Sequence, residues 1–134
     1  MQATTTLSSA TRSNAGFIWI KLAVVYLIIG ISIGMAMGAS HNFTLRPVHA
    51  HINLLGFVTL TLSGLIYSLF PAAGESKLAK VHFWMMNGAL PFMMLGLAGM
   101  LLGYQQTLLV MIVAEFVLAG SVIAFAANLF INLK

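Results

Sequence analysis

Two histidines separated by one residue, His49 and His51, are the residues in this sequence best suited to chemistry. They follow Arg46 and Pro47 at the start of a long apolar stretch. Ionisable side chains inside a membrane span are costly, so they count as candidates for function by default. A neutral imidazole is a common metal ligand and a good axial ligand of haem iron. We therefore predict that His49 and His51 are metal ligands.

The spacing of the two histidines restricts the kind of site they can form. Residues i and i+2 of an α-helix project about 200° apart. His49 and His51 should therefore point to nearly opposite sides of their helix, which disfavours a compact tetrahedral zinc site built from the pair. Each could instead bind a different cofactor. The alternative is that both are interfacial histidines in contact with water among the lipid headgroups.

Two further residues on the same side of the membrane could complete a haem site. His41, in the preceding loop, could reach a haem edge or supply a sixth ligand, or it could be a plain loop residue. Arg46 could pair with the haem propionates, because arginine pairs well with carboxylates. Its alternative role is that of an ordinary interfacial anchor. The cofactor-binding candidates are thus His41, Arg46, His49 and His51, with the last two as metal ligands.

Polar residues in the later apolar stretches have simpler interpretations. His82 begins the third stretch, and we interpret it as an interfacial anchor. Glu115 lies about 13 Å into the fourth stretch by helical rise. We expect Glu115 to be protonated or hydrogen-bonded to a neighbour. Candidate neighbours are Thr59, Thr61 and Ser63.

Four long apolar stretches must position these residues. Of the 134 residues, 60% are hydrophobic and 6% are charged, whereas a soluble domain carries about 25% charged residues. Stretches at 17–39, 47–70, 81–103 and 107–130 each exceed the roughly 20 residues that cross a bilayer. Short connections make sequential helices antiparallel neighbours. We predict an all-α integral membrane protein, an antiparallel four-helix bundle forming one domain at 17–134, after a disordered cytoplasmic tail at 1–16.

The distribution of basic residues predicts the orientation in the membrane. Five of the six Lys and Arg residues would lie on one side of such a bundle, and Arg46 alone on the other. These five are Arg12, Lys21, Lys77, Lys80 and Lys134. The positive-inside rule then places both termini in the cytoplasm of a multi-pass inner-membrane protein. It also explains the net charge of +4 without nucleic-acid binding. The chain has no cysteine, which excludes disulfides and thiolate metal sites.

Small residues recur every four positions in two of the stretches. Gly30, Gly34 and Gly38 line one face of the first, and Gly99 and Gly103 repeat this spacing in the third. Such faces let another helix approach closely, either within the chain or from a second copy. Four spans enclose little volume for a large cofactor. We therefore expect a homodimer.

The second and third stretches resemble two consecutive late helices of the haem–copper oxidase catalytic subunit, a family similar to the nitric oxide reductases. The first of those helices carries a His-x-His pair and ends in a Gly-aromatic-Pro pattern, and the next begins with His-Phe. The matching residues are His49-Ala50-His51, Gly64-Leu65-Ile66-Tyr67-Ser68-Leu69-Phe70-Pro71, His82-Phe83-Trp84 and Leu95-Gly96-Leu97-Ala98-Gly99-Met100.

The resemblance implies that His49 and His51 each bind haem. In that family the first histidine of the pair binds the high-spin haem and the second binds the low-spin haem. Arg46-Pro47-x-His49 is also similar to an early helix of the nitric oxide reductases, which would make His49 the low-spin ligand. The three copper-binding histidines, the cross-linked tyrosine and the proton-channel residues have no counterpart here. Full oxygen reductase activity is therefore not expected.

We predict a truncated, four-helix relative of this family that acts as a membrane haem b protein. It would carry one or two haems per protomer, or share them across a homodimer. The function would be electron transfer, or binding of a diatomic gas such as nitric oxide or oxygen, with a respiratory redox partner. One alternative is a non-catalytic accessory or assembly subunit of a respiratory complex. Another is a haem or metal chaperone.

Overall fold

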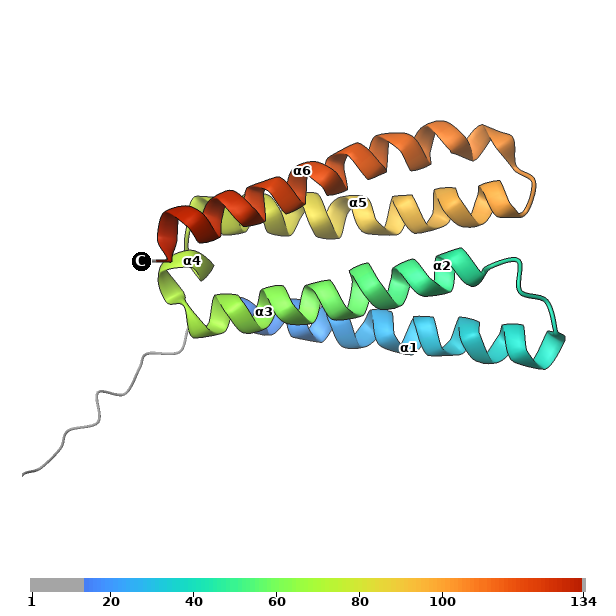
Figure 1. Cartoon of the computed structure of the whole chain (residues 1–134), viewed down its shortest axis with the longest axis horizontal. Coiled ribbons are helices and arrows are strands. Elements are labelled where there is room, and N and C mark those ends of the chain that lie inside the picture. The colour runs from blue at the N-terminus through green and yellow to red at the C-terminus, as the bar shows by residue number, and fades with distance from the viewer. Residues whose placement is uncertain (1–13, 134) are drawn as a thin grey trace, which may run out of the picture.

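The computed structural model describes residues 14–133, and its long elements are all helices (Figure 1). After a 3-10 turn, η1 (Asn14–Gly16), the elements are α1 (Phe17–Ser40), α2 (Arg46–His51), the π-helical segment η2 (Ile52–Thr59), α3 (Leu60–Leu69), α4 (Pro71–Gly74), α5 (Lys77–Leu101), η3 (Gln105–Thr107) and α6 (Leu108–Asn132). Four helices are long and apolar enough to cross a membrane: Asn14–Ser40, Arg46–Leu69, Lys77–Leu101 and Gln105–Asn132. The prediction of an all-helical chain with four candidate membrane spans is confirmed.

Two boundaries differ from the sequence prediction by more than two residues. The expected tail at 1–16 is too long, because Asn14–Gly16 already form a turn and the backbone at Gly16 packs closely on Gly64. Residues 1–13, including Arg12, and Lys134 lie outside the described part of the chain. The third long helix begins at Lys77 rather than at 81, because the Ser76 hydroxyl caps it by accepting a hydrogen bond from the backbone N–H of Ala79 at 3.0 Å.

The first hairpin consists of α1 packed along the continuous rod α2–η2–α3 (Figure 1). Gly16 meets Gly64 near α4, whereas Gly30 meets Asn53 further along. Residue numbers therefore rise along one helix as they fall along its neighbour. The close approach depends on glycine. A Cβ atom at Gly64 would lie 2.7 Å from the Gly16 oxygen.

The second hairpin consists of α5 and α6, which lie side by side over most of their length (Figure 1). Gly96 of α5 faces Met111 of α6, and Gly120 of α6 faces Met85. α5 also touches α2 and η2, so it lies between α6 and the first hairpin. Its buried residues form much of the apolar core. These include Met86, Leu90, Met93 and Met94.

The glycine-lined faces of the helices pack mostly against other residues of the same chain. Gly30 lies under Asn53, Gly34 lies under the ring of His49, and Gly99 faces Thr107. Gly38, by contrast, has no atom within 4 Å of the position a Cβ would take. The glycine spacing therefore reflects packing inside each hairpin and gives little support to a second copy.

Replacing Gly64 by alanine should destabilise the first hairpin, because the new methyl group would collide with the backbone of Gly16. We expect the free energy of unfolding to fall by about 1–3 kcal/mol, as for other overpacked sites. Gly88→Ala is the matched control, since its Cβ would meet no atom within 4 Å. Both variants gain the same helix propensity. Denaturation in detergent, followed by circular dichroism, compares them; equal stability of the two variants would contradict the contact.

Candidate functional site

The His49 ring is held between the two helices of the first hairpin. Its Nδ1 lies 2.8 Å from the backbone oxygen of Gly30 on α1, and the side chain is half-buried. A carbonyl oxygen can only accept a hydrogen bond, so Nδ1 of the ring must carry the proton. In the neutral ring Nε2 then keeps its lone pair. Gly34 makes room for this ring, since a Cβ there would lie 2.8 Å from Cε1 of His49.

Asn53, one turn along from His49, supports this arrangement. Its side-chain Nδ2 donates to the backbone oxygen of His49 at 2.8 Å. The same nitrogen lies 3.4 Å from Nδ1 of His49. Because both of these nitrogens carry hydrogen, the longer contact is not a hydrogen bond. The amide therefore packs against the imidazole while leaving its proton directed at Gly30.

The His51 ring has the same tautomer but a different partner. Its Nδ1 lies 2.7 Å from the backbone oxygen of Pro47, four residues earlier on the same helix. This oxygen is again an acceptor only, so Nε2 of His51 is the nitrogen with the lone pair. His49 is oriented by α1 and His51 by its own helix. The two rings share no partner, and each presents one unprotonated nitrogen.

The other two candidate residues flank this region. Arg46 is exposed, and its guanidinium lies 5.3 Å from the centroid of the Phe43 ring. His41 ends α1 in the left-handed conformation with φ of 52°, and it is exposed in the loop. Neither side chain is brought into hydrogen-bond contact with His49 or His51. Within residues 14–133, no group of three or more His, Asp and Glu side chains is arranged to hold a metal ion.

A π-helical segment follows His51 directly and was not predicted. It spans Ile52–Thr59, and the Thr59 hydroxyl donates to the Leu54 oxygen five residues earlier at 2.9 Å. π-helical turns are rare and often occur at functional sites. The wider turn changes the direction of the side chains beyond it and seats Gly56 against the Tyr26 ring. An apolar segment of this kind carries no local signal that distinguishes π from α.

A second polar cluster, at the α4 end of the molecule, contains His82. The ring is only 1% exposed, and its Nδ1 lies 2.8 Å from the Tyr67 hydroxyl. It is flanked by Trp19 and Phe125, with ring centroids at 4.5 and 4.8 Å. The interpretation of His82 as an interfacial anchor is therefore wrong. The early start of α5 at Lys77 carries this residue into the interior.

Asn128 of α6 fixes the direction of the hydrogen bonds in this cluster. Its Oδ1 accepts from the hydroxyl of Ser76 at 2.9 Å and from Nδ2 of Asn132 at 2.7 Å. Its Nδ2 therefore donates to the Tyr67 oxygen at 3.3 Å, and also to the Ala73 oxygen at 3.0 Å. The Tyr67 hydroxyl accepts from the amide and is free to donate its own proton. That proton goes to Nδ1 of His82.

The environment of Glu115 differs from the one that the sequence predicted. It is exposed on α6, and within the described residues it makes no hydrogen bond to the three hydroxyls proposed for it. Thr59 is bonded within its own helix, and the hydroxyls of Thr61 and Ser63 are buried without a partner. The expected pairing of Glu115 with one of these hydroxyls is wrong.

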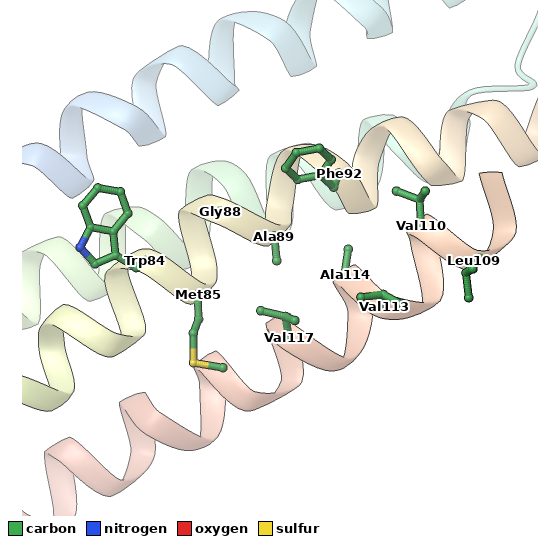
Figure 2. A pocket seen from close by; sticks show the side chains of 10 residues that line it. All are labelled: Trp84, Met85, Gly88, Ala89, Phe92, Leu109, Val110, Val113, Ala114 and Val117. Atoms are coloured by element: carbon green, nitrogen blue, oxygen red, sulfur yellow. The ribbon is translucent and has the colours of Figure 1, made fainter.

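The largest of five hollows between or beside the helices is not a polar site. It measures 470 Å³ and lies between α5 and α6, where Figure 2 shows the side chains that line it. Its lining consists of apolar and aromatic side chains, from Trp84 and Met85 to Leu109 and Val110. None of the five hollows is lined by His49 or His51. The large apolar hollow therefore belongs to neither of the two histidine-containing clusters.

Comparison with known proteins gives no assignment. No protein-family model, no characterised protein and no solved structure matches this chain. The resemblance to the haem–copper oxidases consequently rests on the motif residues alone.

Replacing Asn128 by leucine should destabilise the protein. The change leaves the Ala73 oxygen and the Ser76 hydroxyl without their buried partner, at a cost of about 1–3 kcal/mol for a buried polar group left unsatisfied. Asn132→Leu is the control, because Asn132 is only half-buried and lies at the edge of the network. Unfolding in detergent should show a larger loss for Asn128→Leu. An equal loss in both variants would show that the network does not depend on Asn128.

Proposed function

We propose that this chain is a membrane haem b protein in which His49 and His51 are the axial ligands. The observation that carries the proposal is that Nδ1 of each ring donates to a backbone carbonyl, at 2.8 and 2.7 Å. Ligating histidines nearly always donate their second ring nitrogen to such an acceptor, which fixes the tautomer and orients the ring. Both rings are thus prepared to offer Nε2 to iron.

The neighbouring residues are compatible with haem. Arg46 is exposed and stacks only on Phe43, so its N–H groups are available to a carboxylate such as a propionate. His41 is the candidate for a further ligand from the loop. Bound haem would supply a reversible one-electron change at iron and, where a coordination position is open, a site for nitric oxide or oxygen. Each histidine would hold and orient a haem on its own side of the helix.

An apolar hollow favours the gas-binding form of the proposal. It measures 320 Å³ and lies where the first hairpin meets α5. Val48 and Ile52, which flank the two histidines in sequence, contribute to its lining. Apolar cavities in proteins stay dry and accept small apolar molecules. A diatomic gas dissolved in the bilayer could therefore collect next to the helix that carries His49 and His51.

The arrangement in the membrane follows from the same proposal. We place the protein in the inner membrane as an antiparallel four-helix bundle with both termini in the cytoplasm. Lys77 and Lys80 at the start of α5 are exposed, and Arg46 lies at the opposite end of the helices. This charge distribution agrees with the positive-inside rule. The histidine pair then lies in the outer leaflet.

A second copy of the chain would complete the haem site. The His49 ring is half-buried between two helices of one protomer, and a second copy would cover its open side and enclose a haem there. The exposed Glu115 also supports contact with a second chain, since a carboxyl group facing lipid is costly and is usually covered. Because Glu115 lies on α6, this contact would be separate from the one at the histidines. A shared haem would be enclosed between protomers.

The same exposed Glu115 favours a second candidate function. A helix that carries a carboxyl group on its outer face is suited to docking against another membrane subunit that supplies a partner for it. The chain would then be an accessory subunit of a respiratory complex, without its own cofactor.

The optical spectrum of the protein purified in detergent tests the leading proposal. We expect a reduced-minus-oxidised spectrum of a b-type haem that is lost or strongly diminished in His49→Ala and His51→Ala. Removing a ligand leaves the iron without its strongest bond to the protein, whereas His82→Phe, at the α4 end, should leave the spectrum unchanged. Carbon monoxide addition then distinguishes an open iron from a six-coordinate one. A protein that stays colourless when haem is supplied would favour the accessory-subunit function.

Two glycines one turn apart on α1 provide a finer test. Gly34→Ala places a methyl group 2.8 Å from the His49 ring, whereas at Gly38 no atom lies within 4 Å of the added group. We expect Gly34→Ala to lower haem content or shift the haem spectrum, and Gly38→Ala to leave both unchanged. Haem titration of the two purified variants measures this. If the two variants bind haem equally, the position of the His49 ring does not determine haem binding.

A further inference from the structure

Tyr67 and His82 form a buried acid–base pair that the proposed haem site does not use. The hydroxyl of Tyr67 and Nδ1 of His82 are 2.8 Å apart, within the range in which a base can take a proton directly. Tyr67 is 0% exposed and His82 is 1% exposed, so bulk water does not compete. Asn128 donates to the Tyr67 oxygen and so directs the phenolic proton to His82. In this pair Tyr67 is therefore the proton donor and His82 is the acceptor.

Burial disfavours a charged imidazole ring, and the aromatic surroundings of His82 offset part of that cost. The groups that contact the ring are Trp19 from α1, Tyr67 from α3 and Phe125 from α6. The rings of Trp19 and Phe125 are tilted by 37° and 34° to the imidazole, with centroids at 4.5 and 4.8 Å. Aromatic faces attract a cation within about 6 Å. An imidazolium between two aromatic rings has electrostatic support that a simple apolar cavity would not provide.

A chain of aromatic rings connects Tyr67 to the surface. Trp84 is 73% exposed, and its ring centroid is 5.5 Å from that of Phe83. Phe83 lies 5.2 Å from Trp19, and Trp19 lies 5.6 Å from Tyr67. Electron transfer is faster between closely spaced aromatic rings than through saturated side chains. An oxidant that reaches Trp84 from the bilayer is therefore coupled to the buried phenol.

From these three features we propose that Tyr67 and His82 are a proton-coupled redox pair. An organic radical dissolved in the bilayer, acting as the one-electron oxidant, removes an electron from the Tyr67 phenol and becomes its anion, while the O–H bond breaks and its proton forms an N–H bond at Nδ1 of His82. The products are a neutral phenoxyl radical, an imidazolium and the oxidant reduced by one electron. Reduction returns the electron and the proton along the same bond. A phenol oxidised without a nearby base would have to hold an extra positive charge, so His82 makes the step accessible.

The experiment uses the full chain in detergent, with photo-oxidised ruthenium tris(bipyridine) as the one-electron oxidant and persulfate as the terminal acceptor. The chain has three tyrosines, so Tyr26→Phe/Tyr104→Phe leaves Tyr67 alone. Electron paramagnetic resonance should show a phenoxyl radical that persists in this double variant and disappears in Tyr67→Phe. His82→Phe keeps an aromatic ring but removes the base, and we expect the radical yield to fall about tenfold or more.

A second readout does not depend on the stability of the His82 variant. In the otherwise unchanged protein the radical should show hyperfine coupling to one exchangeable proton, which Nδ1 of His82 holds and donates to the phenoxyl oxygen. This coupling should vanish in deuterium oxide. Radical formation confined to Tyr26 or Tyr104 would overturn the proposal. So would a Tyr67 radical that lacks the exchangeable proton, or one whose yield is unchanged in correctly folded His82→Phe.

Discussion

Inside a bilayer a polar group has no water to bind, so leaving it without a partner in the protein is costly. This constraint explains where the chemistry of this chain is concentrated. His49 donates to the Gly30 oxygen across a helix interface, and His51 donates to a carbonyl of its own helix. Tyr67, His82 and Asn128 satisfy one another in the interior. In each case the need for a partner also selects a tautomer or a proton direction.

The architecture could be predicted because hydropathy alone encodes it. Four apolar stretches of sufficient length can only be helices in lipid, and the described chain has four such helices. The different environments of His49 and His51 could also be anticipated, because residues i and i+2 of a regular α-helix such as α2 point to different sides. The His49 ring contacts α1, whereas the His51 ring contacts its own helix. These features depend on local periodicity, which a single sequence displays directly.

The features that were missed depend on contacts between distant residues. The burial of His82 requires α5 to begin at Lys77. The helix is capped there by Ser76, whose hydroxyl also binds Asn128, 52 residues further along the chain. The glycines of α1 could not be assigned to an internal contact until Asn53 and His49 were seen above them. The π-helical segment leaves no local pattern at all. The sequence marked these distant contacts only by isolated polar residues, such as Tyr67 and Asn128, in otherwise apolar helices.

The two polar clusters are separated along the membrane normal. Trp19 contacts the His82 cluster and Gly34 contacts His49, and fifteen residues of α1 place them about 22 Å apart by helical rise. The hydrogen bonds of one cluster therefore do not involve the residues of the other. Glu115 fits neither cluster, being exposed on α6. Residues 14–133 supply no hydrogen-bond partner for this carboxyl group, so the constraint that organises both clusters is not met at Glu115 by the described part of the chain.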